Sequence, residues 1–173
     1  MAVDDIESME RLGDGDVGVH LYVPPGAAEG ELRFKLFRRG GAVPLSQSLP
    51  MLEHMGVRVM DERPAEIEPE GRECVWIYDM GLAADGGVNT DIEAVRGLFE
   101  ETFLRVWRGE AENDDFNKLV LRAGLDWRAV SLLRAYAKYA RQAGFTFSQA
   151  YIEASLAANP SIARQLVELF LER

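Results

Sequence analysis

The spacing of apolar residues changes from strand-like to helix-like near residues 109–112, and this change limits the folds open to the chain. Before it, stretches such as Leu32–Arg38 alternate apolar and polar residues, which is typical of a half-buried strand. After it, apolar residues recur every three or four positions, as on the buried face of a helix. The sequence therefore predicts an α+β domain followed by an all-helical segment.

The first part contains four strand patterns and two helix patterns. The predicted strands are Val17–Val23, Leu32–Arg38, Val57–Arg63 and Cys74–Met80, with polar loops at Pro64–Gly71 and Ala83–Asn89. One helix is expected over Leu45–Met55, and its Pro50 predicts either a late start or a kink. The second helix, Ile92–Arg108, is opened by Thr90 and Glu93 at capping-box spacing. An antiparallel sheet of about four strands covered by two helices is the expected arrangement.

The second part carries start and stop signals for four helices. The predicted helices are Phe116–Ala123, Trp127–Ala143, a helix opened by a Thr146–Gln149 capping box, and Ser161–Arg173. Their short connections predict antiparallel neighbours. We expect residues 1–30 to form a linker with a possible extra strand, residues 31–110 the α+β domain, and residues 111–173 the helical domain.

Charge and residue usage exclude several classes of function. The chain has 29 acidic and 19 basic side chains and a net charge of −10, so its surface repels phosphate backbones and nucleic acid is not an expected partner. One cysteine and two histidines do not make a zinc site of the usual kind. No apolar run is long enough to cross a membrane, so no membrane partner is expected and a cytoplasmic location is predicted.

Two glycine motifs each admit a functional and a structural interpretation. Gly13–Gly18 matches the letters of a dinucleotide-binding loop, but it precedes a strand and its Asp14 and Asp16 repel phosphate, which favours an acidic linker. Arg39-Gly40-Gly41 lies between a strand and a helix. The backbone N–H groups of this motif could bind a carboxylate or a phosphate. Alternatively, the motif is only a tight turn that needs the conformational freedom of glycine.

A basic stripe is predicted on the Trp127–Ala143 helix. It consists of Arg128, Arg134, Lys138 and Arg141. This stripe could be a solvated face, with the other sides of the helix (including Tyr136 and Tyr139) buried. Alternatively, it could bind an anionic ligand or an acidic surface, such as that of another domain. The acidic loop before it, Glu112–Asn117, is interpreted as a connector that caps the Phe116 helix. No pair of nucleophile and base and no pair of catalytic carboxylates is apparent, and no metal ligands are predicted.

Two stretches resemble a known family. LRFKLFRRGG at 32–41, followed by VPLSQSLPMLEHMGVRVMDERP at 43–64, is similar to a strand–glycine turn–helix–strand unit of ACT type. VWRGEAENDDFNKLVL at 106–121, AGLDWR at 123–128 and LRAYAKYARQAGF at 133–145 resemble the large bacterial NAD-specific glutamate dehydrogenases. The resemblance covers nearly the whole chain, from about residue 5 to residue 173.

This resemblance implies a non-catalytic, regulatory or scaffolding segment of an NAD-dependent glutamate dehydrogenase. Members of the family are several times longer, and their nicotinamide-binding fold and catalytic lysine would lie beyond residue 173. The parent would convert L-glutamate, NAD and water to 2-oxoglutarate, ammonium and NADH, while no cofactor would bind to this segment itself. The alternatives are a stand-alone amino-acid sensor of ACT type and an interdomain interaction module.

The resemblance also implies a site, partners and one departure from the family fold. An amino-acid effector would bind at Arg39, Gly40, Gly41 and Leu45. The expected partners are the downstream catalytic region, which the basic stripe would contact, and further copies in a homo-oligomer. ACT domains run βαββαβ, but no strand follows Ile92–Arg108, so we expect Val17–Val23 to supply the fourth strand in an altered topology.

Overall fold

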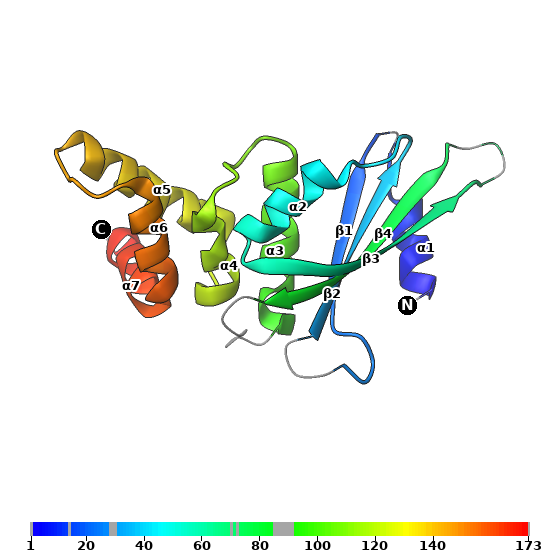
Figure 1. The fold of residues 1–173 in the computed structure, drawn as a ribbon, viewed down its shortest axis with the longest axis horizontal. Helices are drawn as coiled ribbons and strands as arrows, with labels where there is room; N and C mark the ends of the chain where they lie inside the picture. The colour runs from blue at the N-terminus through cyan, green and yellow to red at the C-terminus, as the bar shows by residue number, and fades with distance from the viewer. Residues whose placement is uncertain are drawn as a thin grey trace.

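A four-stranded antiparallel sheet with the order β1-β2-β4-β3 forms one end of the molecule (Figure 1). The computed structural model describes residues 2–13, 15–27, 31–69, 71, 73–84 and 92–172. The strands are β1 Val17–Tyr22, β2 Glu31–Arg39, β3 Val57–Ile67 and β4 Val75–Ala84. The helices of this half are α1 Ala2–Glu10, α2 Leu45–His54 and α3 Ile92–Trp107. This arrangement confirms the predicted α+β class.

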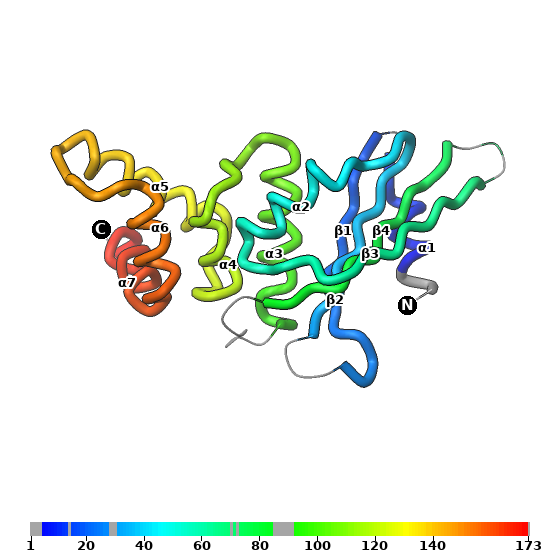
Figure 2. Tube along the Cα trace, in the orientation of Figure 1, coloured from blue at the N-terminus to red at the C-terminus, as the bar shows by residue number. Residues whose placement is uncertain are grey.

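The fourth strand comes from the N-terminal side of the domain, as predicted. β1 pairs with β2 in antiparallel register from Val17↔Arg38 to Tyr22↔Arg33. In a βαββαβ order, a strand in this position would follow α3. Because β1 fills the position instead, α3 is free to lead directly into the helical half (Figure 2).

The two faces of the sheet are covered by different helices, because side chains along a strand alternate in direction. Phe34 of β2 packs against Phe99 and Phe103 of α3, with ring centroids 5.8 and 4.9 Å apart. Lys35 points to the opposite face, where its Nζ lies 2.5 Å from Asp5 of α1. The sheet therefore lies between α1 on one side and α2 with α3 on the other.

Several local features differ from the sequence expectations. Helix α1 lies within the region expected to be a linker. Strand β3 continues to Ile67, so Pro64 lies in a paired strand and not in the predicted loop. β3 is an edge strand, and such a strand tolerates proline because one side of its backbone needs no hydrogen-bond partner. Helix α2 begins at Leu45 and runs through Pro50. Asp14, Thr90 and the loop at 85–91 lie outside the described residues.

The second half is helical, as predicted. Its elements are η1 Asp115–Asn117, α4 Lys118–Ala123, α5 Trp127–Gln142, α6 Gln149–Ala158 and α7 Pro160–Leu171. Asp126 caps α5, accepting a hydrogen bond from the Ala129 N–H at 2.7 Å. The predicted cap of α6 at Thr146 is wrong: Ser148 caps this helix by accepting from the Tyr151 N–H.

One hydrophobic core runs through both halves. It contains Phe34 and Phe103 from the sheet layer and Phe116, Leu119 and Val130 from the helical half, all almost completely buried. A shared core of this kind joins the halves more firmly than a flexible linker would. Among the described residues, no helix is long and apolar enough to cross a membrane.

Candidate functional site

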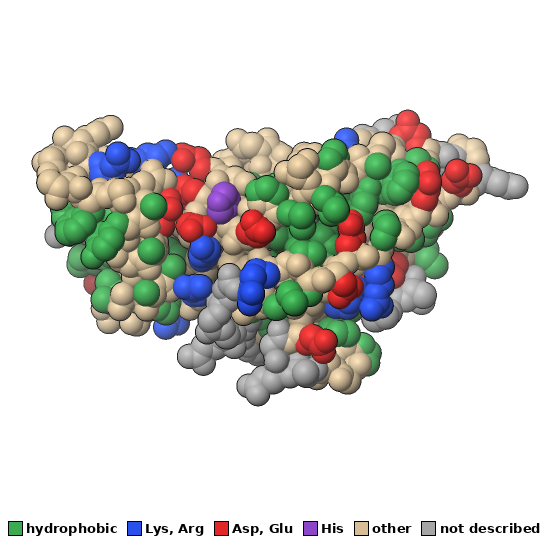
Figure 3. All heavy atoms as spheres, viewed as in Figure 1, with side chains coloured by type: hydrophobic (Ala, Val, Ile, Leu, Met, Phe, Trp, Pro, Cys, Tyr) green, Lys and Arg blue, Asp and Glu red, His purple; other side chains and the backbone are tan. Residues whose placement is uncertain are grey.

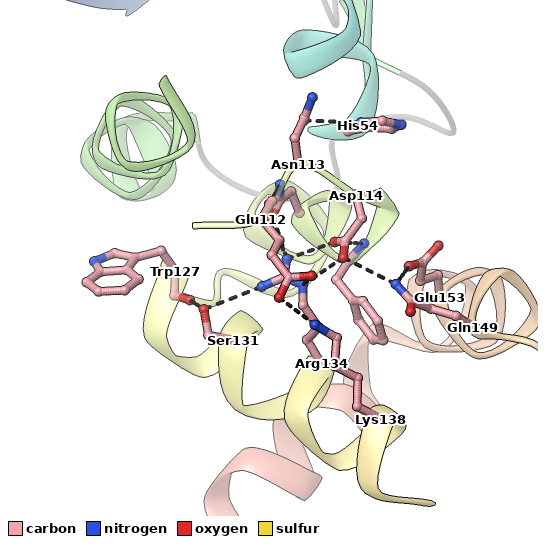
Figure 4. Close-up of polar contacts among 12 residues, drawn as sticks. His54, Glu112, Asn113, Asp114, Trp127, Ser131, Arg134, Lys138, Gln149 and Glu153 are labelled. Carbon is pink, nitrogen blue, oxygen red and sulfur yellow. Dashed lines mark hydrogen bonds and ion pairs between the residues drawn. The ribbon is translucent and has the colours of Figure 1, made fainter. Parts of the chain in front are cut away.

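A buried arginine organises the junction between the two halves (Figure 4). Arg134 of α5 is only 3% exposed. Its Nε and one of its terminal nitrogens donate to the two carboxylate oxygens of Asp114, each at 2.7 Å. The same terminal nitrogen donates to Asn117 Oδ1 at 3.0 Å. This two-pronged pairing holds the connector before η1 against α5 and fixes its orientation.

Asp114 also reaches the two neighbouring elements. It accepts a hydrogen bond from the Phe116 N–H and so caps η1, which confirms the predicted capping role of the acidic connector. Gln149 at the start of α6 donates to Asp114 at 3.4 Å and to Glu153 at 2.8 Å (Figure 4). One carboxylate therefore links the connector, α5 and α6.

A second ion pair lies at the solvent edge of this cluster. Lys138 Nζ donates to Glu112 Oε1 at 2.5 Å. This hydrogen bond, together with the positive charges of Lys138 and Arg134, lowers the pKa of the Glu112 carboxyl below its usual value. Glu112 therefore remains ionised in mildly acidic solution and keeps its contact with α5.

Three contacts tie the junction to the sheet-bearing half. His54 Nδ1 at the end of α2 forms a hydrogen bond with Asn113 Oδ1 at 3.1 Å. The indole nitrogen of Trp127 donates to Glu101 of α3 at 3.0 Å, and the guanidinium of Arg105 lies 5.0 Å from the Trp127 ring centre. These contacts and the shared core connect the junction to the sheet-bearing half.

The basic stripe predicted from the sequence is not one exposed surface. Arg134 is buried in the ion pair described above, whereas Lys138 binds Glu112 at the surface. Arg128 stacks over Trp127 at 4.6 Å, and Arg141 is exposed. The acidic connector that folds against Arg134 and Lys138 could not be located from helical periodicity. A contact between these residues and another domain stays a prediction.

The predicted amino-acid site at the glycine turn is only partly assembled. Gly40 adopts a φ of +92°, and its N–H donates to the Cys74 carbonyl at 2.9 Å. Gly41 faces open space and Leu45 is exposed at the start of α2. Arg39 points away to the α1 face, where its guanidinium donates to the carbonyls of Met9 and Leu12.

An ionic cluster on the α1 face of the sheet was not recognised from the sequence. Arg33 donates to Asp79 at 2.8 Å and to Asp61 at 3.1 Å. Burial and the neighbouring Asp79 carboxylate raise the pKa of Tyr22 to about 12. The residues of this cluster come from all four strands, and strand register is the signal that would have revealed them.

An apolar groove of about 590 Å³ opens on the surface of the helical half. We call it the aromatic groove; its walls include Tyr136, Tyr139, Phe147, Tyr151, Leu166 and Phe170, from α5, the α5–α6 loop, α6 and α7. Hydrophobic side chains are visible on the surface of this end of the molecule in Figure 3. The prediction that Tyr136 and Tyr139 are buried is wrong, because they are 46% and 70% exposed.

The described residues give no indication of a metal centre. No group of three or more His, Cys, Asp or Glu side chains among them is arranged to hold a metal ion.

Two family models match the chain, one on each half. The glutamate dehydrogenase ACT3 domain matches residues 16–95, and glutamate dehydrogenase helical motif 3 matches residues 111–173. The first contains all four strands of the sheet, and the second contains Arg134, its partners and the aromatic groove.

Curated relatives match over almost the whole chain. The NAD-specific glutamate dehydrogenase of Halomonas elongata is 42% identical over 170 residues, which are 98% of this chain and 10% of that protein. Those of Pseudomonas aeruginosa and Mycobacterium tuberculosis are 37% and 41% identical, over 99% and 98% of this chain and 11% of each protein. The chain thus spans about a tenth of the length of these relatives. It belongs to the NAD-specific glutamate dehydrogenase family and corresponds to the ACT3 domain followed by helical motif 3.

Proposed function

We propose that this chain acts as a non-catalytic scaffolding and regulatory segment of an NAD-dependent glutamate dehydrogenase. The parent enzyme would convert L-glutamate, NAD and water to 2-oxoglutarate, ammonium and NADH, with NAD bound outside this segment. The continuous core that joins the ACT-like sheet to the helical half carries the proposal, together with the buried Arg134–Asp114 pair. A rigid unit of this kind can hold other regions of a long polypeptide at a fixed distance and orientation.

The scaffolding proposal is tested by comparing the segment with the longer enzyme that contains it. The purified 173-residue chain, supplied with L-glutamate and NAD, is expected to produce no NADH. In the longer enzyme, Arg134→Ala is expected to lower activity or its thermal stability, whereas Gln142→Ala at the exposed end of α5 leaves both unchanged. Turnover by the isolated chain, or equal behaviour of the two variants, would contradict the proposal.

The regulatory part of the proposal concerns the turn between β2 and α2. An amino-acid effector would bind beside Gly40, Gly41 and Leu45, where Gly41 has open space around the position of a side chain. Arg39 would act indirectly, by holding the end of β2 against α1. The partner that receives the signal would be the catalytic region of the same polypeptide, within a homo-oligomer.

Calorimetry with each of the twenty amino acids tests this site. We expect heat of binding with at least one of them at millimolar concentration. Gly41→Val should abolish that heat while leaving the circular dichroism spectrum unchanged, because Gly41, unlike Gly40, does not require a positive φ. Binding that survives Gly41→Val, or no heat with any amino acid, would contradict an effector site at this turn.

A further inference from the structure

The aromatic groove exposes more large apolar side chains than a solvated surface normally carries. Tyr139 and Tyr151 are 70% and 56% exposed, and Leu169, at the end of α7, is 55% exposed. In contrast, Phe34, Phe99 and Phe103 in the sheet-bearing half are fully buried. A contiguous apolar patch of this size, with a hollow at its centre, is typical of a docking surface.

The walls of the groove are already ordered by contacts among themselves. Tyr136 and Phe170 pack edge to face at 5.9 Å, which joins α5 to α7. Phe147 and Tyr151 stack at 4.7 Å on the α6 side. Side chains held in this way lose little conformational freedom when a partner binds, so the groove is prepared for an occupant.

The chemistry of the walls determines the secondary structure of the occupant. Apart from Ser155 and the tyrosine hydroxyls, the side chains that line the groove are apolar. An inserted strand or irregular loop would leave its backbone N–H and C=O groups without partners, at a considerable free-energy cost. A helix pairs its own backbone groups and needs only apolar side chains on one face. The small number of polar partners in the groove therefore favours a helix.

We expect the docking helix to belong to the remainder of the same, longer polypeptide. The curated relatives extend over about nine tenths of their length outside the region matched here. A segment on the same polypeptide reaches the groove at a high effective concentration and needs little intrinsic affinity. A helix placed between α5, α6 and α7 would also bury the exposed aromatic side chains of the groove.

We propose that the aromatic groove binds an amphipathic helix from the rest of the same polypeptide, which presents aliphatic or aromatic side chains at helical spacing. This inference rests on the proposed function, because it requires that the chain is part of a longer enzyme. It identifies the contact surface between this segment and its partner region as the aromatic groove rather than the basic stripe on α5.

Hydrogen exchange measured by mass spectrometry tests the proposal in the full-length enzyme. Amides of α6 and α7 are expected to exchange at least about tenfold more slowly in the full-length enzyme than in the isolated 173-residue chain, because the docked helix suppresses local opening. The double variant Tyr139→Glu with Leu169→Glu should remove this protection. The matched control, Ala135→Glu with Gln165→Glu, changes exposed residues on the same helices outside the groove lining and should retain it.

Other outcomes of this experiment identify other occupants. Equal exchange of α6 and α7 in the isolated chain and the full-length enzyme would overturn the proposal. Dimerisation of the isolated chain that is abolished by the groove variant would identify a second copy as the occupant and would overturn it as well. Neither result affects the turnover assay of the isolated chain, so failure of the docking site is distinguishable from failure of the proposed function.

Discussion

Arg134 is the single residue on which the junction depends most. Replacing it with alanine leaves the Asp114 carboxylate, which is only 17% exposed, without its main partner. We expect Arg134→Ala to lower the free energy of unfolding by about 3 kcal/mol, as is usual when one member of a buried ion pair is removed. Urea denaturation followed by circular dichroism measures this loss.

The exposed Arg141 on the same helix provides the comparison for Arg134. Arg141→Ala should change the free energy of unfolding by no more than about 0.5 kcal/mol, as for most surface substitutions. Arg134→Lys keeps the charge but loses the two-pronged geometry, so its stability should lie between those of the wild type and Arg134→Ala. A cost for Arg134→Ala no greater than that for Arg141→Ala would show that the pair does not organise the junction.

Gly81 leaves room for the Asp61 side chain of the ionic cluster on the sheet. A Cβ at this position would overlap the Asp61 carboxylate, with the Asp61 Cγ only 3.0 Å away, and would displace that carboxylate from Arg33. Gly81→Ala is expected to cost no more than about 1 kcal/mol, because the Asp61 carboxylate is the half-exposed end of a flexible side chain and can turn away. Gly97, exposed in the middle of α3 with open space around it, is the control, and Gly97→Ala should gain about 0.5–1 kcal/mol.

A double-mutant comparison separates this explanation from a general intolerance of alanine at residue 81. In an Asp61→Ala background, no carboxylate occupies the space of the new methyl group, so Gly81→Ala should cost much less. Chemical denaturation of the wild type, the two single variants and the double variant measures the cost of Gly81→Ala in each background. An unchanged cost in that background would show that another contact requires the glycine.

Glu100 makes stability depend on pH in the opposite sense to Glu112. Burial raises the pKa of the Glu100 carboxyl, although it accepts the Leu21 N–H at 2.8 Å and lies 3.3 Å from His20 Nδ1. A raised pKa in the folded state contributes stability at acidic pH, which is lost as the pH rises through that pKa. Glu100→Gln imitates the protonated form and should therefore raise the melting temperature at pH 8.

The advantage of Glu100→Gln is expected to disappear below about pH 4, where the wild-type carboxyl is protonated in both the folded and the unfolded state. Melting curves at pH 8 and pH 4 measure the difference in melting temperature between Glu100→Gln and the wild type. The exposed Glu53→Gln serves as the control and should leave the melting temperature unchanged at both pH values. A lower melting temperature for Glu100→Gln at pH 8 would mean that the Leu21 N–H and the positive charge of Arg96 stabilise the carboxylate by more than its burial costs.

Pro50 lowers the stability of helix α2. Proline inside a helix cannot donate a hydrogen bond to the carbonyl four residues earlier, here that of Ser46. Because Pro50 is exposed, Pro50→Ala should gain up to about 3 kcal/mol without altering the core. Pro44, before the first turn of the same helix, has a compatible φ of −64°, so Pro44→Ala should bring no gain. Urea denaturation measures the free energy of unfolding of both variants. Equal changes for Pro50→Ala and Pro44→Ala would contradict this explanation.

Elements defined by local patterns were predictable, whereas those that depend on tertiary contacts were not. The strand at Leu32–Arg38 and the helix at Trp127–Ala143 follow from patterns within a few residues, and both elements were identified correctly. The prediction that this strand is half-buried was wrong, because Lys35 and Phe37 on its second face are buried as well. Helix α1 and the burial of Arg134 depend on partners 20 to 30 residues away, which periodicity does not reveal. The exposure of Tyr139 was missed because an apolar helical face predicts burial but does not specify what covers it.

The whole chain is expected to unfold as one unit, because its core does not divide between the family's ACT3 domain and helical motif 3. Phe116, Leu119 and Val130 of the helical half are fully buried in the same cluster as Phe34 and Phe103. Separating the halves would expose these side chains, and burial of each large apolar side chain contributes about 1.5–3 kcal/mol. The isolated segment 111–173 should therefore have much less helix than it has in the intact chain.

Hydrogen exchange during urea denaturation checks this cooperativity directly. Peptides from β2 and β4 and peptides from α4 and α5 should lose protection at the same urea concentration. The Arg134→Ala variant should lower that concentration for both sets together, since an ion pair at the junction stabilises a single folded unit. Two separate transitions, or a fully helical 111–173 fragment, would mean that the halves are independent domains. The ACT-like sheet and helical motif 3 could then not act as one rigid support for the rest of the enzyme.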